Sequence, residues 1–457
     1  MDTGFLPYRK KLHQKIGTSV WIMAAFALLI GIGAVLLSTP LAARDGQWGD
    51  PMTGLFTATS ATCVTGLVLV DTYTHWSAFG QAVILCLIQI GGLGFMTIAS
   101  MVSFALRRTI TLKERMVMTA SLNVQHMAGI VGMTRRILLG TLLFEGVGAV
   151  VLSACFIPEF GVTGGIWRGI FHSVSAFCNA GFDLMGVYGP YSSLTPYLDN
   201  PVVLFTIMAL IVLGGLGFFV WNDIAWNRRK NRRLTVHSKL VLIMTAVLIF
   251  GGALLIFVAE RNNPATLGGV PEGETVWNAA FQSVTLRTAG FNTLNQDALT
   301  GAGKAVSILL MFIGGCPGST AGGVKVVTVG VLLVAAAAVC RGKSRVFLFH
   351  RMIPAKGVLN AIALFMVGIL AVAAGSFAIC LVDGVSYTRA LYEAVSAFAT
   401  VGTTTGITPS LSTVSQIILM ALMYVGRVGI LTLSIGIMSR KGGEPRISYP
   451  EEAVMIG

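Results

Sequence analysis

Four short segments of this sequence carry small and polar residues before a glycine at one shared register position. Glycine permits positive φ, so each loop can turn backbone carbonyls toward a common axis, where a ring of oxygens replaces the hydration shell of a monovalent cation. The alternative, four ordinary turn glycines, is weakened by the shared position. The segments read Ser60-Ala-Thr-Cys-Val-Thr-Gly66, Ser175-Ala-Phe-Cys-Asn-Ala-Gly181, Val284-Thr-Leu-Arg-Thr-Ala-Gly290 and Ser396-Ala-Phe-Ala-Thr-Val-Gly402. The candidate ion-binding residues are Val64, Thr65, Gly66, Asn179, Ala180, Gly181, Thr288, Ala289, Gly290, Thr400, Val401 and Gly402.

A second candidate site is an irregular stretch inside the apolar segment 305–339. Five glycines and one proline fall within ten residues, and each disfavours a helix, by about 1 kcal/mol for Gly and about 3 for Pro. Non-helical backbone at membrane depth is tolerated where it lines a cavity or is buried in protein, so we expect this stretch to line the pathway. The alternative is a kink stabilised by neighbouring helices. The candidate gate residues are Gly314, Gly315, Cys316, Pro317, Gly318, Ser319, Thr320, Ala321, Gly322, Gly323, Lys325 and Arg427.

Arg427 lies in the middle of the apolar segment 414–438. An arginine at the bilayer centre costs about 2.5 to 17 kcal/mol, depending on the reference, so it must face protein. Its five donors suit the free carbonyls of loop 314–323, and the alternative is an ion pair with Glu145 or Glu393. We expect Lys325 to bind the loop likewise. Arg287 is expected to pair with an acid, because a cation beside the third loop would repel the transported ion.

The composition identifies the elements that must position these residues. Of 457 residues, 54% are apolar and only 11% are charged, against about 45–50% and about 25% in soluble domains. Four semi-apolar pieces of about 13 residues cover only about 20 Å as helices, too short to cross a bilayer. The sequence therefore predicts an all-α polytopic membrane protein with eight transmembrane helices, as four helix–pore-loop–helix repeats around a pseudo-fourfold pore. The long segments lie near 18–38, 79–106, 136–157, 202–226, 239–259, 305–339, 358–382 and 414–438, and the short pieces near 51–63, 166–178, 274–287 and 387–400.

A glycine cluster in the middle of the second long helix supports the fourfold repeat. The cluster begins 25, 33, 24 and 24 residues after the loop glycine. The clusters are Gly91-Gly-Leu-Gly94, Gly214-Gly-Leu-Gly217, Gly314-Gly-Cys-Pro-Gly318 and Gly426-Arg-Val-Gly429. The predicted organisation is an N-terminal segment 1–17, repeat 1 at 18–106, repeat 2 at 136–226, repeat 3 at 239–339 with the gate loop 314–323, repeat 4 at 358–438 and a tail at 439–457.

Charge placement predicts the orientation. Lys and Arg gather in five clusters, near 9–15, 107–136, 228–239, 341–356 and 440–446, which lie between repeats or at the termini. The positive-inside rule makes these segments and both termini cytoplasmic, in a multi-pass protein of the cell membrane. The segments expected outside the cell carry eleven acidic and six basic residues. The acidic residues either raise the concentration of cations at the outer entrance of the pore or only reflect the topology. The basic face can attract anionic lipid or a soluble partner, and no soluble domain offers a nucleic-acid surface.

The four loops resemble the filter segments of the Trk/Ktr/HKT potassium-transporter superfamily, over nearly the whole chain. The resemblance extends to Gly-Ser-Thr-Ala-Gly-Gly-Val-Lys at 318–325, Gly426-Arg-Val-Gly429 and Arg446-Ile-Ser-Tyr-Pro450. Eight spans without an additional N-terminal helix pair are most similar to the Ktr-type (KtrB-like) membrane subunit. The resemblance implies a homodimer with one potassium pathway per protomer, a cytosolic ring of ATP/ADP-binding regulatory subunits, and a loop at 314–323 that blocks the pore below the filter. Glycine at all four filter positions implies potassium over sodium.

The expected function is thus the ion-translocating subunit of a potassium uptake system. Sodium-driven symport, proton coupling and passive conduction all fit the same filter, so K⁺ is the expected ion and Na⁺ a candidate coupling ion, with no covalent cofactor. An alternating-access carrier for another solute is the alternative, but carriers usually show inverted or two-fold repeats. An enzyme is not expected, because HExxH, GxSxG and P-loop patterns are absent. Seven scattered cysteines without CxxC argue against a zinc site or a disulfide framework.

Overall fold

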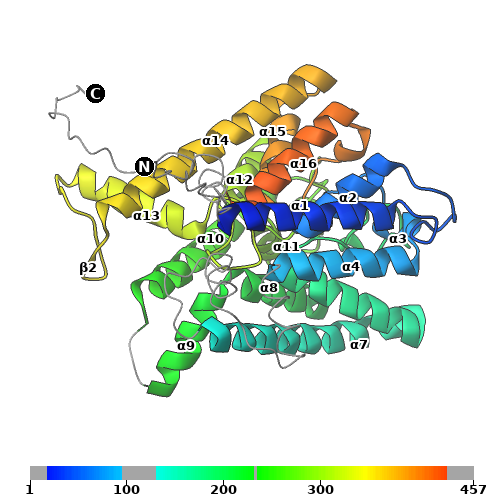
Figure 1. Cartoon of the computed structure of the whole chain (residues 1–457), viewed down its shortest axis with the longest axis horizontal. Coiled ribbons are helices and arrows are strands. Elements are labelled where there is room, and N and C mark those ends of the chain that lie inside the picture. Colours follow the sequence, from blue (N-terminus) through cyan, green and yellow to red (C-terminus); the bar gives the residue numbers. More distant parts are fainter. Residues whose placement is uncertain (1–17, 95–129, 231–233, 430–457) are drawn as a thin grey trace, which may run out of the picture.

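The computed structural model describes residues 18–94, 130–230 and 234–429. Predictions for segments 1–17 and 439–457, for the basic residues at 107–115, and for the far ends of segments 79–106 and 414–438 fall outside these ranges. The regular elements of the described chain are helices apart from one small hairpin (Figure 1). The elements are α1 Thr18–Leu37, α2 Pro51–Cys63, α3 Thr72–His75, α4 Ala78–Leu93, α7 Ile130–Cys178, α8 Pro201–Gly215, α9 Phe218–Lys230, α10 Val236–Glu260, α11 Glu272–Thr285, α12 Gly301–Phe312, α13 Val326–Cys340, β1 Phe347–Leu348, β2 Arg351–Met352, α14 Ala355–Asp383, α15 Tyr387–Ala399 and α16 Thr413–Val428.

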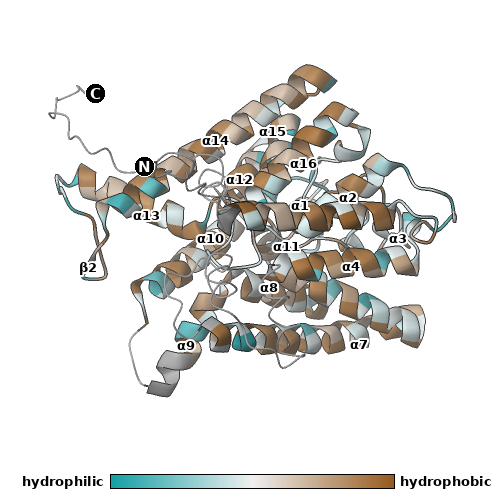
Figure 2. Cartoon of the chain, viewed as in Figure 1, coloured by the Kyte–Doolittle hydropathy of each residue, from teal (hydrophilic) through white to brown (hydrophobic). Residues whose placement is uncertain are grey.

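The predicted helical membrane fold is confirmed. Four described helices, α1, α7, α10 and α14, are long and apolar enough to cross a membrane, and α8 with α9 forms a further candidate bent by 90°. Their outward faces carry large apolar side chains such as Leu28, Phe250 and Leu370, which are 66%, 75% and 62% exposed, and Figure 2 shows these helices mostly in the hydrophobic colours. Such surface suits lipid. The count of eight spans stays a prediction, because α4, α12, α13 and α16 are each shorter than a span.

The helices form four groups that close into a ring. In the first group, α2 packs between α1 and α4, and in the last, α15 packs between α14 and α16. The remaining groups are α7 with α8, and α10 with α11 and α12. Neighbouring groups meet through α4 and α7, α8 and α11, α12 and α15, and finally α16 and α2. The first and last parts of the chain are therefore neighbours, as Figure 1 also shows for α1 and α16.

The second helix of a group ends at its glycine cluster rather than running through it. Helices α4, α8 and α16 stop immediately before or within the clusters, whose last glycines Gly94, Gly217 and Gly429 have φ of 82°, 90° and 90°. After Gly217 the chain resumes as α9 in a new direction. The prediction of a long helix with the cluster in its middle is wrong for the described residues, because a positive-φ residue cannot continue a right-handed helix.

The short helices agree with the sequence in three groups and differ in one. Helices α2, α11 and α15 lie within two residues of the predicted pieces. The second predicted piece, 166–178, is instead continuous with the preceding segment in α7, which is interrupted at Gly161 (φ 73°, ψ 172°) close to Pro158. Proline removes a helix hydrogen bond and Gly161 supplies the left-handed turn. The chain therefore turns back here without a loop between two separate helices.

Candidate functional site

Each short helix leads into a loop with the same backbone pattern. A left-handed residue that is not glycine lies two positions before each loop glycine. Such residues persist only where the surrounding structure determines them, and they gather at functional sites. They are Val64, Asn179, Thr288 and Thr400, with φ of 59°, 60°, 71° and 52°. The recurrence of this conformation at one offset in all four loops shows that the loops share a backbone fold.

The four loops meet one another in cyclic order. Each loop glycine has positive φ, between 70° and 94°, and lies so close to the next loop that an added Cβ would overlap its backbone. The atom that a Cβ would meet is always the carbonyl oxygen of the residue before the next glycine. An ideal Cβ would lie 2.4 Å from Ala180 O if built on Gly66, 2.6 Å from Ala289 O on Gly181, 2.5 Å from Val401 O on Gly290, and 2.1 Å from Thr65 O on Gly402. All twelve candidate ion-binding residues from the sequence lie in this closed ring.

Side-chain hydroxyl groups form hydrogen bonds with the backbone of the loops. The Ser60 hydroxyl accepts a hydrogen bond from the Gly66 amide at 3.0 Å, and Ser396 does the same for Gly402 at 3.1 Å. Ser175 instead donates to the carbonyl oxygen of Phe182 at 2.7 Å. In the third loop Val284 stands at the serine position, and the neighbouring Thr285 donates to the carbonyl oxygen of Phe291 at 2.6 Å. Sequence reasoning gave these hydroxyls no role, although the recurrence of serine six residues before three of the glycines was the available signal.

Helix ends also direct partial negative charge at the ring. Helices α2, α7 and α15 end at the residue immediately before a left-handed loop residue, so their carboxyl ends face the loops. The carboxyl end of a helix carries about half a negative charge. Together with backbone carbonyls, these ends make the ring favourable for a cation, without any carboxylate among the twelve loop residues.

Loop 314–323 is irregular and lies against the ring. No helix covers residues 314–323, and its ends are held together by a bridge between Ile313 and Val324. A Cβ on Gly322 would lie 2.2 Å from the hydroxyl oxygen of Thr400, a loop residue of the fourth group. The Thr320 hydroxyl donates to the carbonyl oxygen of Phe177 at 3.2 Å, at the end of α7. Loop 314–323 thus contacts the ring at two places, the fourth loop and the end of α7.

The carboxyl end of α8 binds the loop through backbone atoms. The amide of Cys316 donates to the carbonyl oxygen of Gly215 at 3.1 Å, and the amide of Thr320 to that of Gly214 at 3.3 Å. In return, the Phe218 amide donates to the carbonyl oxygen of Gly318 at 2.8 Å. These bonds satisfy carbonyls that α8 leaves free where it breaks. The helix break and the loop are therefore one structural unit.

Arg427 joins the loop to two further helices. Its guanidinium donates to the carbonyl oxygens of Thr320, Gly91 and Gly92, the last at 2.9 Å. The expected contact with loop 314–323 is present. The alternative of an ion pair is wrong for the two acids considered, because Glu145 accepts from the Gln89 amide at 3.0 Å and Glu393 accepts from Thr404 at 2.6 Å.

Two other cations lie near the same loop. Lys325 donates from Nζ to the carbonyl oxygen of Ala321 at 2.6 Å, which is the expected kind of contact. Arg287 is buried, and its Nε has no hydrogen-bond partner in the described part of the chain. The expectation that Arg287 pairs with an acid is wrong there, since Arg287 forms no ion pair with an acid of the described chain. The guanidinium interacts electrostatically with the side chain of Cys316, in loop 314–323.

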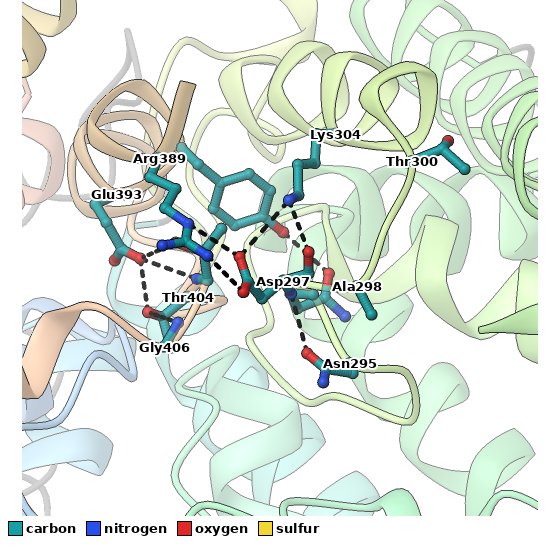
Figure 3. A network of polar contacts seen from close by, with 12 residues as sticks. Asn295, Asp297, Ala298, Thr300, Lys304, Arg389, Glu393, Thr404 and Gly406 are labelled. Atoms are coloured by element: carbon teal, nitrogen blue, oxygen red, sulfur yellow. Dashed lines mark hydrogen bonds and ion pairs between the residues drawn. The ribbon is translucent and has the colours of Figure 1, made fainter. Parts of the chain in front are cut away.

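Polar contacts tie the third group to the fourth (Figure 3). Asp297 accepts from Arg389 on α15 at 2.7 Å and lies 3.6 Å from the Lys304 ammonium on α12. Nearby, the buried Glu393 accepts from the hydroxyl and the amide of Thr405, at 3.1 and 2.9 Å, in addition to its bond from Thr404. Glu393 thereby fixes the chain that follows Gly402. Sequence reasoning considered Glu393 only as a partner for Arg427 and missed this role.

Comparisons with known proteins agree on one family. The sequence model of TrkH, described as cation transport protein, matches residues 19–440. The potassium/sodium uptake protein NtpJ of Enterococcus hirae is 39% identical over 454 residues, which cover 98% of this chain and 99% of that protein. The Ktr system potassium uptake protein B of Bacillus subtilis is 39% identical over 433 residues, covering 94% and 95%. The crystal structure of the potassium transporter TrkH from Vibrio parahaemolyticus shares the fold, with a TM-score of 0.73 at 16% identity, covering 93% of this chain and 86% of that one.

Proposed function

Because the chain belongs to the TrkH family of cation transport proteins, we propose that it is the ion-translocating subunit of a potassium uptake system. Relatives at 39% identity over nearly the full length are named potassium/sodium uptake protein and Ktr system potassium uptake protein B. This family assignment makes the chain a transporter and not an enzyme. The transported ion of this chain is proposed to be K⁺.

One observation carries the proposal, the closed ring of four loops. Each loop glycine faces a carbonyl oxygen of the next loop, and the order returns from the fourth loop to the first. Four backbone segments of one conformation around an axis can offer carbonyl oxygens that replace the hydration shell of a cation. We assign the twelve ring residues to ion binding, in the first place through the carbonyls of Thr65, Ala180, Ala289 and Val401.

Loop 314–323 is proposed to gate this pathway. It lies against the ring, its backbone is held by α8, and Arg427 holds it to α4 and α16. Its glycines make other backbone conformations accessible. A segment that changes between two conformations under small forces is a recurrent form of switch. Lys325 and Arg427 would then stabilise the blocking conformation.

The assembly and its orientation are also proposals. The name of the Bacillus subtilis relative refers to a Ktr system, which supports association with further components. We propose a homodimer that binds a cytosolic ring of nucleotide-binding subunits through its basic face, with both chain termini in the cytoplasm. Membrane lipid is a further partner, and no nucleic acid is expected. An alternating-access carrier remains the second candidate for the mechanism, and coupling to Na⁺ is favoured by the name of NtpJ.

Rubidium uptake into liposomes that contain the purified chain tests the proposed function. We expect uptake that external K⁺ inhibits and that Na⁺ at equal concentration inhibits much less. Repeating the measurement with and without a sodium gradient distinguishes symport from passive conduction. Uptake no greater than in protein-free liposomes, from correctly folded protein, would contradict potassium transport, and counter-flow of amino acids or sugars would favour the carrier.

A further inference from the structure

A cavity of about 300 Å³ lies where the carboxyl end of α13 meets the β1–β2 hairpin. Part of its lining is apolar and comes from one face of α13 together with the hairpin. Leu333 and Ala337 are four residues apart, so they lie on the same face of the helix, and Phe347 closes the cavity from β1. Leu333 and Phe347 are 58% and 55% exposed. This part of the cavity therefore offers apolar surface that no other described segment covers.

The rest of the lining is basic. Arg341, Lys343 and Arg345 follow α13 directly and all three line the cavity. Each is exposed, and none forms an ion pair with an acid of the described chain. No acidic residue lines the cavity. Three uncompensated cations at one edge make an anionic group the suitable occupant for this edge.

The position of the cavity matches the border of a membrane. Helix α13 contains no charged residue and follows loop 314–323, which lies against the ring. Its fifteen residues cover about 22 Å, so a helix that begins near the bilayer centre passes the end of the hydrocarbon at about 15 Å and ends among the headgroups, which extend to about 20–22 Å. Figure 1 shows the hairpin at the end of the molecule opposite α3. The change from apolar to basic lining therefore falls where acyl chains give way to headgroups.

We propose that this cavity binds one anionic phospholipid. The phosphate group lies against Arg341, Lys343 and Arg345, and the beginning of an acyl chain lies against Leu333, Ala337 and Phe347. An acidic segment of a soluble protein would use the three cations but would leave the apolar part without a matching group. The proposal depends on the membrane location of the chain and not on potassium as its substrate, so a failure of one leaves the other intact.

Lipid binding to the full chain in detergent, measured by native mass spectrometry, tests this site. Phosphatidylglycerol is titrated against phosphatidylcholine, with the variant R341Q/K343Q/R345Q and a control that removes two charges, R351Q/K356Q, whose exposed basic residues lie outside the cavity. At about 1 kcal/mol for each basic residue near an anionic surface, we expect about a hundredfold weaker phosphatidylglycerol binding by the triple variant, and wild-type binding by the control.

A second variant and a competitor complete the test. Ala337→Trp fills the apolar part while keeping every charge, and should weaken phosphatidylglycerol binding without unfolding a helix face that is exposed. Soluble glycerol phosphate should compete poorly, because it lacks the acyl chain. Unchanged phosphatidylglycerol binding by the triple variant, unchanged binding by Ala337→Trp, or equally effective competition by glycerol phosphate would each overturn the proposal.

Discussion

The guanidinium of Arg427 on α16 donates to the backbone carbonyl oxygen of Thr320 in loop 314–323, 107 residues earlier in the sequence. The same side chain donates to the carbonyl oxygens of Gly91 and Gly92, where α4 ends. One half-buried cation thus joins three segments at the base of the four-loop ring. Hydrogen bonds from a charged donor contribute about 1.5–3 kcal/mol each, so these contacts matter for both the stability of the protein and the position of the loop.

Replacing Arg427 with alanine should raise rubidium flux. Loss of the bond to Thr320 removes about 1.5–3 kcal/mol from the blocking conformation, which allows a rise of about tenfold in the open population. Arg427→Lys, with one point charge, should give an intermediate flux, because lysine lacks the planar fork that reaches several carbonyls. Arg389→Ala is the control, since Arg389 forms an exposed ion pair and such pairs contribute about 0–1 kcal/mol.

A deletion within loop 314–323 tests the same gate by changing the loop and not Arg427. Removing residues 316–320 takes away the contacts with α8 and with Arg427. We expect higher rubidium flux with nearly unchanged preference for K⁺ over Na⁺, because the ring is intact. Flux at or below that of the wild type, in protein that is folded and of the expected size, would contradict the gating role. The loop would then be only a break between helices, and Arg427 would have only a structural role.

Serine at Gly66 or Gly290 should reduce ion selectivity. Both glycines have positive φ, and a Cβ would lie 2.4 Å from Ala180 O or 2.5 Å from Val401 O. The neighbouring carbonyl must move, so we expect the K⁺/Na⁺ permeability ratio to fall about tenfold or more, which is about 1.4 kcal/mol. Gly46→Ser is the matched control, because Gly46 also has positive φ but has open space around it. Unchanged ratios in both ring variants would mean that these loops are not the filter.

Glu393 should act as a positioning residue for the fourth loop. Alanine would leave the Thr405 amide without its acceptor, at a cost of about 1–3 kcal/mol for a buried donor, and would free the chain after Gly402 to move. We expect Glu393→Ala to lower thermal stability and the K⁺/Na⁺ ratio together, and Glu393→Gln to retain most of both, because its amide oxygen still accepts. Glu272→Gln, an exposed acid at the start of α11, is the control. If Glu393→Ala alters stability alone, the residue has only a structural role.

Alanine at Gly426 should destabilise the protein. A Cβ there would lie 1.8 Å from the carbonyl oxygen of Phe398, at the end of α15, so α15 and α16 would have to separate. Overpacking costs about 1–3 kcal/mol and occasionally more. Gly251→Ala on α10 is the control, because nothing lies within 4 Å of the new methyl group and alanine favours a helix by about 1 kcal/mol. Equal melting temperatures of the two variants in detergent would contradict the close packing.

The ring of four loops could be predicted because the sequence pattern of the loops occurs four times. Gly66, Gly181, Gly290 and Gly402 stand at one register position, and four copies of one unit can close only around an axis. The nearly constant spacing between each loop glycine and the glycine cluster of its group also has a physical cause. Gly91, Gly214 and Gly426 each approach the carbonyl oxygen four residues before the loop glycine of their own group, those of Thr62, Phe177 and Phe398.

Other features depend on contacts that a linear pattern does not contain. Hydropathy continues through Gly214–Gly217, so the 90° bend after α8 was hidden within a uniformly apolar segment. The merging of the second short helix into α7 depends on the conformation of Gly161. The environment of Arg287, beside Cys316, and the threonines around Glu393 follow from how loops distant in sequence meet in space.

Crystals of the full chain grown with rubidium in place of potassium, measured at the rubidium absorption edge, show directly whether a potassium ion binds within the ring of four loops. We expect an anomalous difference peak on the axis enclosed by the carbonyl oxygens of Thr65, Ala180, Ala289 and Val401. Flat density inside the ring, with rubidium peaks elsewhere in the same crystal, would contradict such binding.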